Sequence, residues 1–118
     1  MSFANILNEA LEQVRGAQFA GVVSADGLGV DVVTADTACD PVVAELELGE
    51  VAAALNGASQ RLSGGSVRDF LIESERMTYV ASQVMPGYYA VIGIDPETHL
   101  GRARFAAKQI AQRLQHEL

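Results

Sequence analysis

The chain has 118 residues, a length that fits one domain with a substantial hydrophobic core. It is 49% hydrophobic and 19% charged, which is the composition of a globular protein and excludes a disordered chain. The net charge is −7, and the eight basic residues are scattered along the sequence, so we predict no nucleic-acid partner.

The sequence also argues against membrane insertion and secretion. No apolar run approaches the roughly 20 residues that a membrane span needs. The first eleven residues include Asn5, Asn8 and Glu9, which a signal peptide would not carry there. The single cysteine, Cys39, cannot form an internal disulfide and is typical of a reducing compartment. We therefore predict a cytoplasmic protein.

The N-terminal third predicts a helix followed by a hairpin. Apolar residues from Phe3 to Val14 recur at spacings of three and four, and Gly16 is placed to end that helix. Two valine-rich segments follow, Phe19–Ser24 and Leu28–Thr34. The residues between them, Ala25-Asp26-Gly27, favour a tight turn.

The segment Pro41–Leu62 predicts a helix with two apolar sides, with Asp40 as its N-cap. At 100° per residue, one side carries Leu48, Val51, Ala52, Leu55 and Leu62. The opposite side carries Val43, Leu46, Ala53, Ala54 and Gly57. The small residues of the second side would let another backbone approach closely. We therefore expect this helix to meet both its own core and a partner.

Three strands and a last helix complete the predicted order. The strand signals are Val67–Ser74, Met77–Val84 and Tyr88–Ile94, and the short connections at Glu75-Arg76 and Pro86-Gly87 permit only antiparallel hairpins. After the loop at 95–98, apolar residues from Leu100 to Leu114 return to helical spacing. We predict one α+β domain over residues 1–118, with a five-stranded antiparallel sheet between helices.

Little in the sequence indicates catalysis. Cys39, His99 and His116 are too few and too far apart to predict a metal site or an activated nucleophile. Gly27-Leu28-Gly29 lacks the third glycine of a dinucleotide loop, and no Gly-Lys-Ser or Gly-Lys-Thr phosphate loop occurs. We predict no catalytic, cofactor-binding or metal site, and no enzyme activity of the chain itself.

One cluster leaves two interpretations open. Aromatic and methionine residues concentrate on two neighbouring predicted strands: Met77, Tyr79, Met85, Tyr88 and Tyr89. They fit strands that pack under helices, and they also fit the lining of a small pocket. The second interpretation would make the chain a small-molecule sensor domain of the GAF or profilin-like type, which we keep as the alternative.

Several strings resemble the roadblock / dynein light-chain domain, in its bacterial branch that includes a gliding-motility GTPase regulator. Gly21–Leu28 resembles the first hairpin of that family, with an Asp-Gly pair at the turn. Ala52–Ala58 resembles its alanine-rich second helix, and His99–Arg104 resembles the entry to its last helix. The resemblance extends from about Phe3 to Leu114.

The resemblance implies a homodimer in which the second helices lie side by side. The third strands would pair edge to edge and make one continuous ten-stranded sheet. The implied interface residues are Val43, Leu46, Glu50, Ala53, Ala54, Gly57 and Arg61 on the helix, and Phe70 and Ile72 on the strand. The resemblance also implies a small Ras-like GTPase as partner, which the chain would activate or hold as a scaffold.

Overall fold

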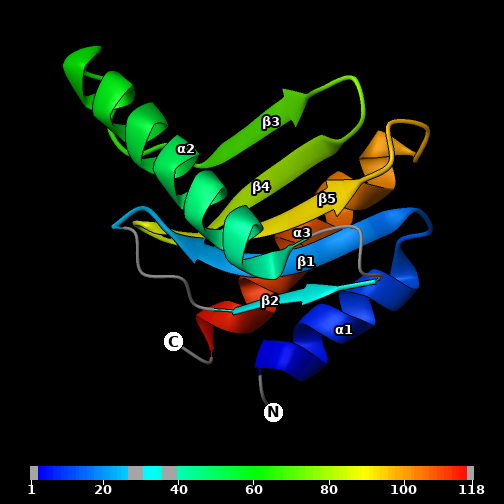
Figure 1. Cartoon of the computed structure of the whole chain (residues 1–118). Helices are drawn as coiled ribbons and strands as arrows, with labels where there is room; N and C mark the ends of the chain where they lie inside the picture. The colour runs from blue at the N-terminus through cyan, green and yellow to red at the C-terminus, as the bar shows by residue number, and fades with distance from the viewer. Residues whose placement is uncertain (1–2, 27–30, 36–39, 117–118) are drawn as a thin grey trace.

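The structure is a computed structural model that describes residues 3–26, 31–35 and 40–116. The predicted α+β fold is confirmed, with three helices and five strands in the predicted order (Figure 1). The elements are α1 (Phe3–Gln13), β1 (Ala17–Ser24), β2 (Asp31–Thr34), α2 (Pro41–Arg61), β3 (Asp69–Glu73), β4 (Thr78–Met85), β5 (Tyr88–Ile94) and α3 (Leu100–Gln115).

The five strands form one antiparallel sheet in the order β2-β1-β5-β4-β3. The helices α1 and α3 cover one face of this sheet, and α2 crosses the other face diagonally (Figure 1). Among the described residues, β3 pairs with β4 alone, with Phe70 opposite Ala81 and Ile72 opposite Tyr79. It therefore lies at one edge of the sheet.

The two faces carry cores of different size. The larger core lies between the sheet and the helices α1 and α3, and includes the fully buried Leu7, Ile92 and Leu114. The smaller core lies under α2, and its buried members are Phe19, Val23, Leu48, Ala52, Ala81, Tyr89 and Val91. The helix α2 is thus the only described helix on this face of the five-stranded sheet.

The start of α2 follows the predicted capping pattern. The side chain of Asp40 accepts a hydrogen bond of 3.0 Å from the backbone N–H of Val42, and Pro41 occupies the first turn. Further along, a Cβ on Gly49 would lie 2.9 Å from the carbonyl oxygen of Ser24. The missing side chain therefore lets α2 approach the end of β1 closely.

At the C-terminal end of α2, the structure contradicts one prediction. Leu55 and Leu62 were predicted to face the core, but Leu55 is exposed and 82% of Leu62 is accessible to solvent. The reason is tertiary: the C-terminal turns of α2 project past the sheet, so no strand lies beneath them (Figure 1). Among the predicted inward residues, Leu48 and Ala52 are buried and Val51 is half-buried.

The third strand is shorter than the predicted Val67–Ser74, because Val67 bonds outside the sheet. Its N–H donates to the side-chain oxygen of Asn56, and its carbonyl accepts from the hydroxyl of Tyr89. The predicted turn at Gly27, the first part of the predicted second strand and Cys39 lie outside the described residues. No helix in the described part of the chain is long and apolar enough to cross a membrane.

Candidate functional site

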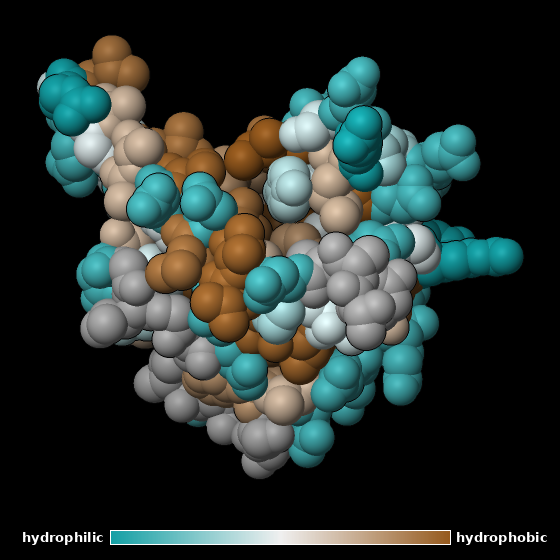
Figure 2. Space-filling view, in the orientation of Figure 1, coloured by the Kyte–Doolittle hydropathy of each residue, from teal (hydrophilic) through white to brown (hydrophobic). Residues whose placement is uncertain are grey.

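The outer side of α2 leaves large apolar side chains in solvent. Val42, Val43 and Leu46 lie in its first two turns, and 60% of Val42 and 53% of Leu46 are accessible. Figure 2 shows hydrophobic residues gathered over this side of the molecule, around a hollow. An isolated exposed leucine is ordinary, but a contiguous apolar patch on one helix is typical of an interaction surface.

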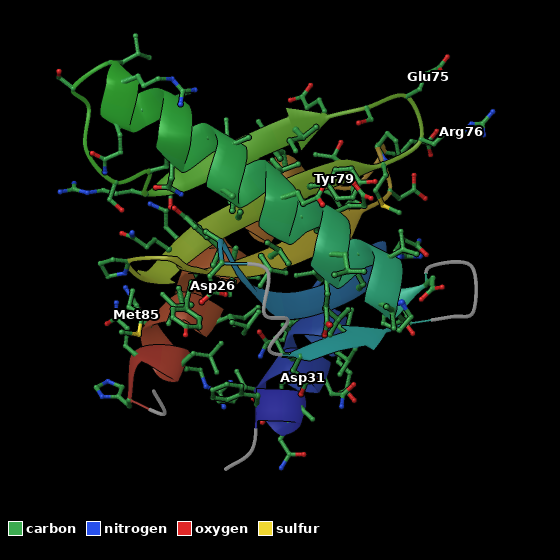
Figure 3. All side chains as sticks on the ribbon, turned by 60° about the vertical axis from the view of Figure 1, so that its left-hand side comes forward. Asp26, Asp31, Glu75, Arg76, Tyr79 and Met85 are labelled. Atoms are coloured by element: carbon green, nitrogen blue, oxygen red, sulfur yellow. The ribbon has the colours of Figure 1, made fainter. Side chains whose placement is uncertain are left out.

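The hollow is a groove between α2 and the strands β3 and β4, with a volume of about 540 Å³. Its lining residues are Phe19, Asp40, Val43, Ala44, Glu47, Leu48, Val51, Ile72, Met77 and Tyr79. Figure 3 shows Tyr79 beside α2, where its ring lies 6.1 Å from that of Phe19. The groove is apolar along its floor, and the lining carboxylates Asp40 and Glu47 both come from the N-terminal part of α2.

The strand β3 forms the outer border of this groove. Its side chains alternate: Phe70 and Ile72 lie on the α2 side, whereas Asp69, Leu71 and Glu73 are exposed on the opposite side. The ring of Phe70 meets Tyr89 edge-on at 5.5 Å. No further strand pairs with β3 among the residues that the structure describes. An edge strand of this kind is a template for pairing with another chain.

A buried polar clamp positions α2 against the sheet. The hydroxyl of Tyr89, which is fully buried, donates to the carbonyl of Val67 at 2.6 Å and accepts from the amide nitrogen of Asn56 at 2.9 Å. The same amide donates to the carbonyl of Ala52, and the Asn56 oxygen accepts from the N–H of Val67 at 2.9 Å. These hydrogen bonds join three segments: α2, β5 and the residues just before β3.

The structure places the predicted interface residues on one side of the molecule. On α2, Val43, Leu46, Glu50, Ala53, Ala54 and Arg61 are exposed and Gly57 is half-buried. The guanidinium of Arg61 lies over Gly57, where an added Cβ would be 3.3 Å from it. On β3, Phe70 and Ile72 are half-buried and face the groove. These positions agree with an interface, which stays a prediction.

One lining residue of the groove was not predicted from the sequence: Glu47 lies one turn after Val43 and lines the same groove. Met77 and Tyr79, which the sequence left open as pocket-lining residues, do line it. The clamp was also missed, although a polar Asn56 within an alanine-rich helix could have indicated it.

The aromatic and methionine cluster does not form one pocket. Met77 and Tyr79 line the groove, and Tyr89 is buried beneath α2. Tyr88 packs against the core on the α1 and α3 face, and Met85 is exposed. Since the cluster divides between both faces of the sheet, the structure does not favour the small-molecule sensor.

No arrangement for chemistry appears in the described ranges. His99 caps α3 by accepting from the N–H of Arg102 at 3.4 Å, and His116 lies at the other end of that helix. Within residues 3–26, 31–35 and 40–116, no three histidine, cysteine, aspartate or glutamate side chains gather to hold a metal ion. The candidate site is therefore the apolar groove together with the edge of β3.

The sequence matches no protein-family model and no curated protein, whereas the fold matches solved structures along almost the whole chain. A structure of MglB in a tetrameric arrangement has a TM-score of 0.82 at 20% identity, covering 97% of this chain and 85% of that one. The Roadblock/LC7 domain of Streptomyces avermitilis has a TM-score of 0.76 at 16% identity, covering 95% and 93%.

The chain thus has the roadblock-domain fold of these structures, as the resemblance implied. MglC from Myxococcus xanthus is similar in sequence as well. It is 28% identical, with a TM-score of 0.72, and the match covers 100% of both chains.

Proposed function

We propose that this roadblock domain is a homodimeric regulatory module that binds a small Ras-like GTPase in the cytoplasm. In this proposal it acts as an activator or scaffold and has no active site of its own. The observation that carries it is the continuous uncovered surface made by the outer side of α2, the apolar groove and the edge of β3. The likeness to MglB and MglC supports the regulatory role.

A second copy supplies what this surface lacks. Pairing β3 with β3 across a two-fold axis would satisfy the backbone groups at the edge and continue the sheet. The same axis would bring two α2 helices together, so that apolar side chains on their outer sides leave water. The tetrameric arrangement of an MglB structure supports self-association.

The charges on α2 suit such a pairing. Helices related by a perpendicular two-fold axis run antiparallel. If the axis passes near Ala54, residues equally far before and after it face each other across the dimer. Glu47 and Arg61 each lie seven residues from Ala54, about 10 Å along the helix. Glu47 of each copy then faces Arg61 of the other, with Glu50 one turn nearer.

The centre of the pairing is made of small residues. Ala54, Gly57 and Ala58 occupy the turns around the axis, where a long side chain would hold the helices apart. The outer side of α2 is therefore self-complementary: small at the centre, and acidic and basic at opposite ends.

A charge exchange tests this dimer. Light scattering on a sizing column should show a dimer for the wild type at micromolar concentration. Arg61→Glu places like charges opposite Glu47 and Glu50 and should weaken the dimer by about tenfold or more. Combining it with Glu47→Arg and Glu50→Arg should restore the dimer. Arg15→Glu, which reverses an exposed charge near the end of α1, is the matched control.

The outcomes separate the parts of the proposal. A wild type that stays monomeric at micromolar concentration would refute the homodimer. A dimer that tolerates Arg61→Glu would refute only the antiparallel pairing of α2.

The GTPase partner is tested directly. Purified small GTPases from the same genome, loaded with GDP or a non-hydrolysable GTP analogue, are measured for binding by calorimetry. We expect one of them to bind in a nucleotide-dependent way. Hydrolysis of GTP by that partner then distinguishes activation, which raises the rate, from scaffolding, which leaves it unchanged. If none binds in either state, the GTPase part of the proposal is wrong.

A further inference from the structure

The helix α3 has a charge opposite to the rest of the chain. It contains four basic residues, Arg102, Arg104, Lys108 and Arg113, and no carboxylate. The remainder of the chain has all 15 acidic residues and only four basic ones. Because α3 lies on the face of the sheet opposite α2, this basic segment is separate from the proposed dimer surface (Figure 1).

The exposed side of α3 combines these charges with an aromatic ring. The inner side is buried and mostly alanine, whereas Arg104, Phe105 and Lys108 point into solvent. Phe105 is 54% accessible, although buried positions lie next to it at Ala106 and Ala107. We call Arg102, Arg104, Phe105 and Lys108 the basic ridge.

The charged side chains of the basic ridge are largely available to bind a partner. Arg113, beyond the ridge, is held by Glu9 at 2.6 Å. Lys108 lies 3.5 Å from Asp69, but both side chains are about half exposed, and such surface pairs contribute little. The guanidinium groups of Arg102 and Arg104 form no ion pair with another described residue.

Hollows flank the ridge on both sides. Between α3 and β3 lies one of about 210 Å³, lined by Asp69, Phe70, Leu71, Val80, Ala81, Ser82, Arg104 and Lys108. Leu71 is 41% accessible. Toward α1 lies a second hollow of about 310 Å³, lined by Gln13, Val14, His99, Gly101, Arg102, Phe105, Ala106 and Gln109. A ridge between two hollows is a shape that can hold side chains of a partner.

We propose that the basic ridge is a docking site for a short acidic segment of another protein. Carboxylates of that segment would pair with Arg102, Arg104 and Lys108, since charge-assisted hydrogen bonds to carboxylates are the strong ones. Its apolar side chains would pack on Phe105 and enter the hollow beside Leu71. The ridge thus recognises a segment that alternates acidic and apolar residues.

The charge distribution selects a short protein segment over larger anions. The helix α3 is about 24 Å long, and electrostatic screening at physiological salt acts over about 8 Å. A DNA duplex or an anionic membrane extends beyond the ridge and meets a surface on which acidic residues outnumber basic ones almost four to one. A segment of a few residues contacts mainly the basic ridge, and Asp69 is the carboxylate beside it.

The side chains of the ridge lie on the face covered by α1 and α3, away from a second copy at α2. The hollow beside Leu71 is lined by β3, so a segment in it and a second copy paired to β3 would lie next to each other. With both bound, the domain would connect a third protein to the dimer.

The test uses the full chain and a synthetic peptide of twelve residues that places two leucines and one phenylalanine in a glutamate background. Fluorescence anisotropy measures its binding, and amide chemical shifts locate it. We expect binding that weakens with salt, with shifts concentrated on α3 and β3. The pair Arg104→Glu and Lys108→Glu should weaken binding by about tenfold or more, and Phe105→Ser by about fivefold with an unchanged salt dependence.

Arg76→Glu reverses one charge in the turn before β4 and should bind as the wild type, and circular dichroism verifies that each variant is folded. A peptide with lysine in place of glutamate should not bind. The proposal is overturned if the acidic peptide fails to bind, or binds the Arg104 and Lys108 variant equally well. It is also overturned if phosphatidylserine vesicles or duplex DNA bind the ridge more tightly than the peptide.

Discussion

The two faces of the sheet are closed in different ways. On one face, α1 and α3 bury a large core that includes Leu7 and Leu114, and the chain completes this face by itself. On the other, α2 alone crosses the sheet and leaves a groove of about 540 Å³ beside the edge strand. The first face therefore supplies stability within one copy. The second leaves an uncovered groove, where we propose that a second copy binds.

Deleting a core side chain from the first face should have the largest effect. Leu7→Ala removes a fully buried leucine and should lower the free energy of unfolding by about 2–5 kcal/mol. Leu46→Ala on the exposed side of α2 is the contrasting variant, and should change the stability of an isolated copy by less than about 0.5 kcal/mol. Urea unfolding at low protein concentration measures both. Similar losses for the two variants would show that the faces do not differ.

A long charged side chain on the second face should break association without unfolding the chain. Ala54→Arg places a guanidinium at the predicted centre of the helix pairing and should weaken the dimer by about a hundredfold. Helical content by circular dichroism should not change. Gln60→Arg makes the same addition at an exposed site about 120° away around α2 and should leave the dimer intact. A normal dimer in Ala54→Arg would mean that this side of α2 is ordinary surface.

A variant that weakens the Tyr89 clamp tests how firmly α2 is held to the second face. Tyr89→Phe removes the hydroxyl and leaves the carbonyl of Val67 and one N–H of Asn56 short of a partner. We expect a loss of about 1–3 kcal/mol in the free energy of unfolding. Hydrogen exchange should show the C-terminal half of α2 opening more often. Tyr88→Phe is the matched control, and an equal loss there would contradict the role of the clamp.

The smallest effect is expected at the N-cap of α2. Asp40→Ala removes the acceptor for the N–H of Val42 and should cost about 0.5–2 kcal/mol. Asp40→Asn keeps a capping oxygen, so it should lose much less. If thermal unfolding shows the same loss for alanine and asparagine, the effect of Asp40 comes from its charge and not from the cap.

The elements were largely predictable because they depend on local spacing. The two-residue connections could only be hairpins, and Asp40 and Pro41 marked the start of α2. The predicted outer set of α2, from Val43 to Gly57, is indeed at the surface or half-buried. The groove was not predictable, since Met77, Tyr79 and Ile72 meet α2 only after two strands have paired in register.

The sequence alone determined the order of helices and strands and the two apolar sides of α2, because each follows from residues a few positions apart. Only the tertiary structure decided how far α2 runs past the sheet, which is why Leu55 and Leu62 are exposed. It also decided that β3 lies at an edge and that hollows flank the basic ridge. Such features depend on which distant elements pack together, and helical or strand periodicity carries no information about that choice.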